Sequence, residues 1–131
     1  MADGVVHATD SLALSPVAAG IAYAATGQWE LAGLASAGCI AGVFLTPDLD
    51  MPRGGWLWRA LWWLYQAKIP HRSRWSHLPI LGTAVRLAYL FAVAVLVACI
   101  FGAPMPKSYD WLSPIFWGLV LSDTAHALRD L

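Results

Sequence analysis

The chain has 131 residues, of which 59% are hydrophobic and only 12% are charged, and its formal net charge is zero. This composition argues against an ordinary soluble domain, and it lacks the basic surface and the motifs of a nucleic-acid-binding protein. It favours an integral membrane protein, and residues 1–131 are expected to form a single membrane-embedded metal-binding domain.

Three segments lack charged residues, and each is close to the length of a bilayer crossing: residues 11–29, 31–47 and 87–106. A fourth apolar run, residues 111–122, is taken as a span that ends near Leu128. Gly27-Gln28 is expected to form a tight turn, and prolines break the helix in the loop 103–110. The expected fold is therefore all-α, with about four transmembrane helices.

Small residues recur four apart in the first two spans. Gly20 and Ala24 form one pair, and Gly38 and Gly42 form the other. This spacing lets helix backbones approach closely in lipid, although alanine and glycine can also simply fill a membrane helix. The same feature makes a homo-oligomer plausible, without indicating its stoichiometry.

A tryptophan-rich segment, GWLWRALWWLYQAK at residues 55–68, carries Arg59 and Lys68 among its aromatics. Such a helix is expected to lie in the membrane interface, in contact with lipids, and not to cross the membrane. Alternatively, the aromatics only anchor the fold at headgroup level.

The basic residues set the expected orientation. Six of the eight lie between the second and third spans: Arg53, Arg59, Lys68, Arg72, Arg74 and Arg86. By the positive-inside rule this stretch is cytoplasmic, and alternation places both termini there. All four histidines and most aspartates fall on the same side, although the rule made no use of them.

TPDLDMP, residues 46–52, ends the second span with an Asp-x-Asp between two prolines. Proline stops regular helix, and in a turn Asp48 and Asp50 can both face one cation. The alternative is an ordinary helix stop with solvated carboxylates.

SDTAHALRD, residues 122–130, places Asp123, His126 and Asp130 at i, i+3 and i+7, on one face of a helix. Because such groups are costly beside hydrocarbon, a partner or a metal is expected. An amphipathic surface end is the alternative.

PHRSRWSH, residues 70–77, contains His71 and His77, six residues apart, so a shared site needs a turn or an irregular segment between them.

These imidazoles and carboxylates form a ligand set suited to zinc, manganese or ferrous iron, with enough donors for two ions that share one aspartate. Cys39 and Cys99 lie within apolar runs and are expected to be packing residues. Arg72 or Arg74 is positioned to neutralise an anionic oxygen of a substrate.

The order of four motifs, an N-terminal His, P-D-L-D-x-P, H-R-S-x-x-S-H and H-x-x-x-D, resembles the bacterial YdjM-like membrane-bound metal-dependent hydrolases. The resemblance is strongest to their metal-binding branch of unknown function. It covers nearly the whole chain and implies a location in the bacterial inner membrane. The ligands that it implies are His7, Asp48, Asp50, His71, His77, His126 and Asp130.

The sequence thus predicts a metal-dependent hydrolase, with zinc as the first choice of ion and the site at the cytoplasmic interface. The substrate class expected from this location is a phosphoester or related bond in a lipid or other membrane-associated molecule. Arg72 and Asp123 are the predicted catalytic residues, with Asp123 orienting ligands or coordinating. The alternative is a noncatalytic metal-binding membrane protein. A metal transporter fits less well, because the outer halves of the spans carry almost no polar groups.

Overall fold

The computed structural model describes residues 4–52, 54–71 and 73–130. Within them the chain is all-α, as predicted, with six α-helices, one 3-10 helix and no strand. The elements in chain order are α1 (Gly4–Thr26), α2 (Trp29–Ala41), η1 (Pro47–Asp50), α3 (Trp56–Lys68), α4 (Arg74–His77), α5 (Pro79–Phe101) and α6 (Leu112–Arg129).

The turn predicted at Gly27-Gln28 is confirmed. Gly27 has a φ of +69°, in the left-handed region that glycine adopts without steric cost, and its N–H donates to the Tyr23 carbonyl at 2.7 Å. Tyr23 then stacks on Trp29, with ring centroids 4.1 Å apart. The chain therefore reverses directly from α1 into α2.

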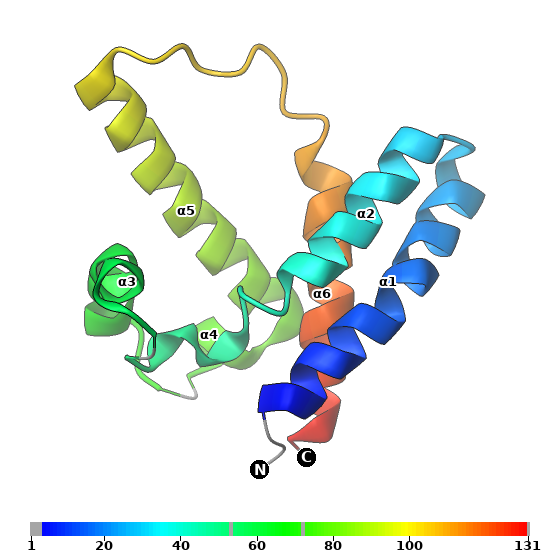
Figure 1. Ribbon diagram of the computed structural model, residues 1–131, viewed down its shortest axis with the longest axis horizontal. Coiled ribbons are helices and arrows are strands. Elements are labelled where there is room, and N and C mark those ends of the chain that lie inside the picture. The colour runs from blue at the N-terminus through cyan, green and yellow to red at the C-terminus, as the bar shows by residue number, and fades with distance from the viewer. Residues whose placement is uncertain (1–3, 53, 72, 131) are drawn as a thin grey trace.

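Helices α1, α2 and α6 pack side by side as a bundle around Ala18, Ala35 and Cys39 (Figure 1). Glycine makes the α2–α6 contact close, because a Cβ at Gly38 would meet the Ile115 backbone and one at Gly118 would meet the Ala35 carbonyl. The small-residue prediction thus fits Gly38. A Cβ at Gly20 would have no described atom within 4 Å, so Gly20 makes no such contact.

Helix α5 contacts α6 near its own start and then diverges from the bundle, with α3 lying beside it (Figure 1). The inner face of α3 buries Trp62 and Tyr65, which pack with Leu49 of η1 and with Tyr89 of α5. Gln66 donates hydrogen bonds to the carbonyls of Leu49 and Met51, at 3.1 and 3.0 Å. Helix α3 therefore holds the Asp-x-Asp turn in place from one side.

Among the described residues, two helices are long and apolar enough to cross a membrane, not the four expected. They are residues 5–26 and 79–101. Helix α2 stops at Ala41, because the chain turns there towards Pro47, and its 13 residues span only about 20 Å against a hydrocarbon core of about 30 Å. Helix α6 is not apolar enough to count as a membrane span, because its last turns carry Asp123 and His126.

The surface of the chain is unusually apolar for a water-facing protein. On α5, Leu96, Ile100 and Phe101 are exposed, and on α3 the outer face exposes Trp56 and Trp63. Monomeric soluble proteins rarely leave such large contiguous patches uncovered, so this surface is consistent with contact to lipid or to another protein.

Candidate metal centre

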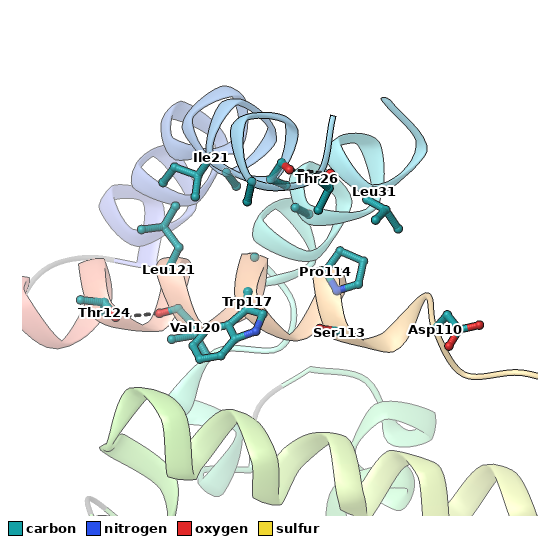
Figure 2. Close-up of a pocket in the computed structure, with 15 residues that line it drawn as sticks. Ile21, Thr26, Leu31, Asp110, Ser113, Pro114, Trp117, Val120, Leu121 and Thr124 are labelled. Atoms are coloured by element: carbon teal, nitrogen blue, oxygen red, sulfur yellow. Dashed lines mark hydrogen bonds between the residues drawn. The ribbon is translucent and has the colours of Figure 1, made fainter. Parts of the chain in front are cut away.

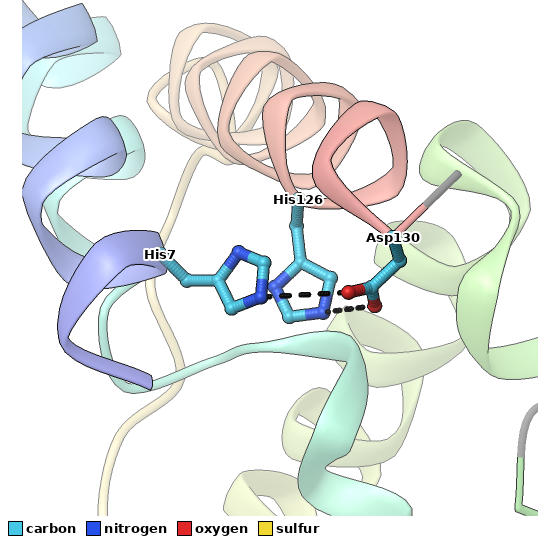
Figure 3. A group of neighbouring side chains, drawn as sticks. All are labelled: His7, His126 and Asp130. Atoms are coloured by element: carbon cyan, nitrogen blue, oxygen red, sulfur yellow. Dashed lines mark ion pairs between the residues drawn. The ribbon is translucent and has the colours of Figure 1, made fainter. Parts of the chain in front are cut away.

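The start of α1 and the end of α6 lie together at the bottom of the bundle and bring three donor groups together (Figure 1, Figure 3). His7 comes from the first turn of α1, while His126 and Asp130, four residues apart, come from the end of α6. His7 Nε2 lies 3.7 Å from Asp130 Oδ1, and His126 Nε2 lies 3.3 Å from Asp130 Oδ2. We call these three residues the His7 cluster.

Both histidines of the His7 cluster are buried, with only 6% and 5% of their surface exposed. Their rings stack at 3.7 Å, and His126 Nε2 has no hydrogen-bond partner among the described residues. Burial lowers the pKa of His126 below 6.5, and His7 adds to this effect. A buried imidazole nitrogen that makes no hydrogen bond and faces a carboxylate at 3.3 Å is suited to bind a cation.

The spacing of the His7 cluster fits one divalent ion. Its three ligand atoms all lie within 4.8 Å of one another. Two donors at about 2.0–2.2 Å from the same ion stand roughly 3–4 Å apart. The separations of Asp130 from His7 and from His126, 3.7 and 3.3 Å, lie in this range. Two neutral imidazoles and a carboxylate form the donor set of many catalytic zinc sites, which keep a fourth position for water.

A second polar group lies next to the His7 cluster, and we call it the Asp50 network: Asp50, His71, Ser76 and His77. The buried Asp50 carboxylate meets His71 Nδ1 at 2.9 Å and accepts a hydrogen bond from Ser76 Oγ at 3.0 Å. Ser76 Oγ also lies 2.8 Å from His77 Nδ1.

Asp48 stands between the two groups. Its Oδ1 atom is 4.0 Å from His126 Nε2 and 3.8 Å from His77 Nε2. The 3-10 turn that begins at Pro47 makes this possible, because it aims Asp48 at the end of α6 while Asp50 points to α4. Both carboxylates also approach His77, with Asp48 Oδ1 3.8 Å from Nε2 and Asp50 Oδ2 3.9 Å from Nδ1.

A cavity of about 310 Å³ opens beside the His7 cluster. His7, Asp48 and His126 form its polar wall, and the remaining lining is mostly apolar, from Val43, Phe44, Leu49, Met51 and Trp58. A small amphiphilic molecule matches such a wall on both sides.

A larger cavity of about 460 Å³ lies between α6 and the pair α1 and α2 (Figure 2). It is lined mainly by small and apolar side chains, among them Ile21, Leu121 and Trp117, and Asp110 at one end is the sole ionisable residue in its described lining. It offers no chemistry of its own.

Asp123 lies apart from the donor groups, although its helical phase suggested a shared face. It is buried and forms an ion pair with Arg86 of α5, and it accepts a hydrogen bond from Thr83. Arg86 also donates to the Ser76 carbonyl at 3.1 Å. The partner expected for a carboxylate at this depth is thus Arg86, and the pair joins α5, α6 and α4.

Of the predicted residues, seven gather at this end of the bundle in two adjoining groups: His7, Asp48, Asp50, His71, His77, His126 and Asp130. Arg72 lies outside the described residues, and Arg74 is exposed at the start of α4. Sequence reasoning missed Ser76 and Arg86. A signal existed for Arg86, since it is the last charge before an apolar run and so needed a buried acid.

A family model described as "Uncharacterized metal-binding protein (DUF2227)" matches residues 2–131. The chain therefore belongs to this family of metal-binding proteins. Comparison with curated proteins and with solved structures found no significant match.

Proposed function

From this family membership and from the His7 cluster, we propose that the chain is an integral membrane metal-dependent hydrolase, related to the YdjM-like enzymes. Its substrate is a phosphoester or similar bond of a lipid or other membrane-associated molecule. The observation that carries the proposal is that His7 and His126, which face Asp130, also line the cavity of about 310 Å³. A structural metal site is usually closed, whereas a catalytic one keeps an accessible position.

In this proposal His7, His126 and Asp130 hold the ion, and zinc is the best match to two imidazoles and one carboxylate. A divalent ion there supplies a Lewis acid for an oxygen of the scissile bond and lowers the pKa of a water molecule. The apolar side of the cavity, with Phe44, Met51 and Trp58, binds the hydrocarbon part of the substrate.

Two further residues support the reaction in this scheme. Arg72, next to His71 in sequence, pairs with an anionic oxygen of the substrate. Asp123 acts as a positioning residue, because its ion pair with Arg86 fixes α6 one turn before His126.

We propose that the protein is embedded in the bacterial inner membrane through α1 and α5. The basic stretch that contains α3 and α4 then places the donor groups on the cytoplasmic side. The outer face of α3, with Trp56 and Trp63 exposed, lies in the interface among lipid headgroups.

A noncatalytic metal site is the second candidate. The burial of His7 and His126, on different helices, favours it, because an ion there would tie the start of α1 to the end of α6. The two functions make different predictions for turnover but the same prediction for metal content.

The test uses the full chain purified in detergent, with metal content measured by elemental analysis. Hydrolysis is then assayed on p-nitrophenyl phosphate and on phospholipids in mixed micelles. We expect bound zinc, manganese or iron and hydrolysis of the micellar substrate, with both lost in His126→Ala and kept in Asp110→Asn, a control at the far end of α6. Bound metal without turnover of any phosphoester would favour the noncatalytic site. A folded protein that stays metal-free when metal is supplied would refute both.

A further inference from the structure

We propose that helix α3 couples the metal centre to the charge of the bilayer surface. Its outer face binds the headgroups of anionic phospholipids, and its inner face then holds η1, the turn that carries Asp48 and Asp50, in place. An anionic bilayer therefore tightens metal binding. The inference rests on the membrane location proposed above, and it concerns metal affinity, so it does not require turnover.

The outer face of α3 is apolar and exposed. Six side chains form it at helical spacing: Trp56, Leu57, Ala60, Trp63, Leu64 and Ala67. The opposite face buries Trp62 and Tyr65, so α3 carries apolar residues on both sides. A helix that is apolar all round is stable when each side is covered. No described residue covers the outer face, so its cover comes from outside the described chain.

The charges around this face select an anionic surface. Arg59 and Lys68, both exposed, lie at its two edges. The sequence has no Asp or Glu between Asp50 and Asp110, and this stretch holds seven of the eight basic residues. Each cation near an anionic bilayer surface strengthens binding by about fivefold. A second copy of the chain on the same face would instead bring like charges together, because α3 has no acidic residue.

The inner face of α3 contacts η1 directly. Gln66 Nε2 donates to the carbonyls of Leu49 and Met51, at 3.1 and 3.0 Å. The buried Leu49 side chain packs with Trp62 and Tyr65. Five residues separate η1 from α3 in the chain. A displacement of α3 therefore displaces η1.

The position of η1 matters to the metal centre. Asp48 Oδ1 of η1 lies 4.0 Å from His126 Nε2, and Trp58 of α3 lines the same cavity as Asp48 and His126. Helix α3 packs on η1 and α5 and stands apart from the bundle (Figure 1). Contact of its outer face with the bilayer restrains it from the second side. Because η1 is then ordered before an ion arrives, the entropic cost of binding the ion is lower.

The test uses the full chain in nanodiscs of phosphatidylcholine, with and without phosphatidylglycerol. Mn²⁺ affinity is measured by electron paramagnetic resonance, and backbone hydrogen exchange is followed in η1 and α3. We expect Mn²⁺ to bind about 5- to 25-fold more tightly in the anionic nanodiscs, the effect of one to two cations at an anionic surface. Exchange should become slower in both η1 and α3.

Two variants separate the binding of lipid from its effect on η1. Arg59→Gln combined with Lys68→Gln should lose the lipid response of both affinity and exchange. Lys107→Gln, which changes an exposed basic residue in the loop after α5, is the matched control and should keep both responses. Gln66→Met should keep the slower exchange of α3 but lose the response of η1 and of Mn²⁺ affinity.

Equal affinity and equal exchange in the two nanodiscs would overturn the coupling. A lipid response that is unchanged in the double variant would also overturn it, because anionic lipid would then only concentrate Mn²⁺ at the surface. Protection of α3 that rises with the number of chains in each nanodisc, and not with anionic lipid, would assign the outer face to a second copy. A protein that binds no metal would refute the proposed function, and the exchange comparison would still decide the coupling. A chain that does not enter nanodiscs would refute the membrane location and the coupling together.

Discussion

Replacing Gly38 by alanine should destabilise the α2–α6 contact on which the position of His126 depends. A Cβ at Gly38 would lie on the Ile115 backbone, with Ile115 Cα at 2.8 Å and its carbonyl carbon at 2.9 Å. Because backbone cannot rotate away as a side chain can, α6 must move. Overpacking of this kind costs about 1–3 kcal/mol.

The matched control is Gly33→Ala in the same helix. Gly33 is exposed, and a Cβ there would have no described atom within 4 Å. Alanine should therefore stabilise the helix at this position by about 0.5–1 kcal/mol. The two variants should differ by roughly 1.5–4 kcal/mol in the free energy of unfolding.

The assay is denaturant unfolding in detergent, followed by circular dichroism, with metal affinity measured on the same samples. Gly38→Ala should unfold at lower denaturant concentration than the wild type and bind metal more weakly, since α6 carries His126 and Asp130. If Gly38→Ala and Gly33→Ala were equally stable, the close approach of α2 and α6 would be refuted.

Three other predictions follow from the buried polar groups. Asp123→Asn should lower the free energy of unfolding by about 3–5 kcal/mol, because it leaves the Arg86 charge buried without a partner. The double change Arg86→Met with Asp123→Leu should recover most of that loss in the same unfolding assay, and a double variant as unstable as the single one would contradict this account. In metal-free protein, the contribution of His126 to stability should decrease as the pH falls below about 6.5, because burial lowers the pKa of His126 in the folded state and its imidazole binds a proton more tightly in the unfolded chain. The slope of melting temperature against pH should be shallower in His126→Gln, and an equal slope would exclude His126 as its cause. Chelator should lower the melting temperature of the wild type and added zinc should restore it, with no response to either in Asp130→Ala.

Local signals in the sequence were sufficient for much of the architecture. Apolar runs of spanning length predicted α1 and α5, and glycine followed by glutamine predicted the turn between α1 and α2. The prolines around Asp48 and Asp50 indicated a break in regular helix, and η1 occupies that place. Each of these features depends on residues within a few positions of one another, so periodicity and backbone preference decide them.

Helix ends were harder to predict because they depend on packing. Helix α2, which packs against α6, ends at Ala41, six residues before Pro47. The chain leaves the helix at Ala41. Hydropathy gives no sign of this helix end. Counting apolar residues therefore produced four spans, where two helices of the described part of the chain are long enough. The tryptophans of α3 also differ in burial, because Trp62 is buried and Trp63 is exposed. Which side of α3 is buried depends on its contact with η1 and α5.

The donor types at the candidate centre were evident from the sequence, but their grouping was not. Asp123 and His126 share a helix face, yet their partners differ. Asp123 forms an ion pair with Arg86, 37 residues away, whereas His126 stacks on His7, 119 residues away. Asp48 and Asp50, two residues apart, both lie within 4 Å of His77, while Asp48 also approaches His126 and Asp50 also contacts His71. The sequence alone determined which chemistry is available at this end of the chain. Only the fold decided which groups lie close enough to share a cation, because binding requires donors within about 4 Å of one another and sequence spacing does not encode that distance across helices.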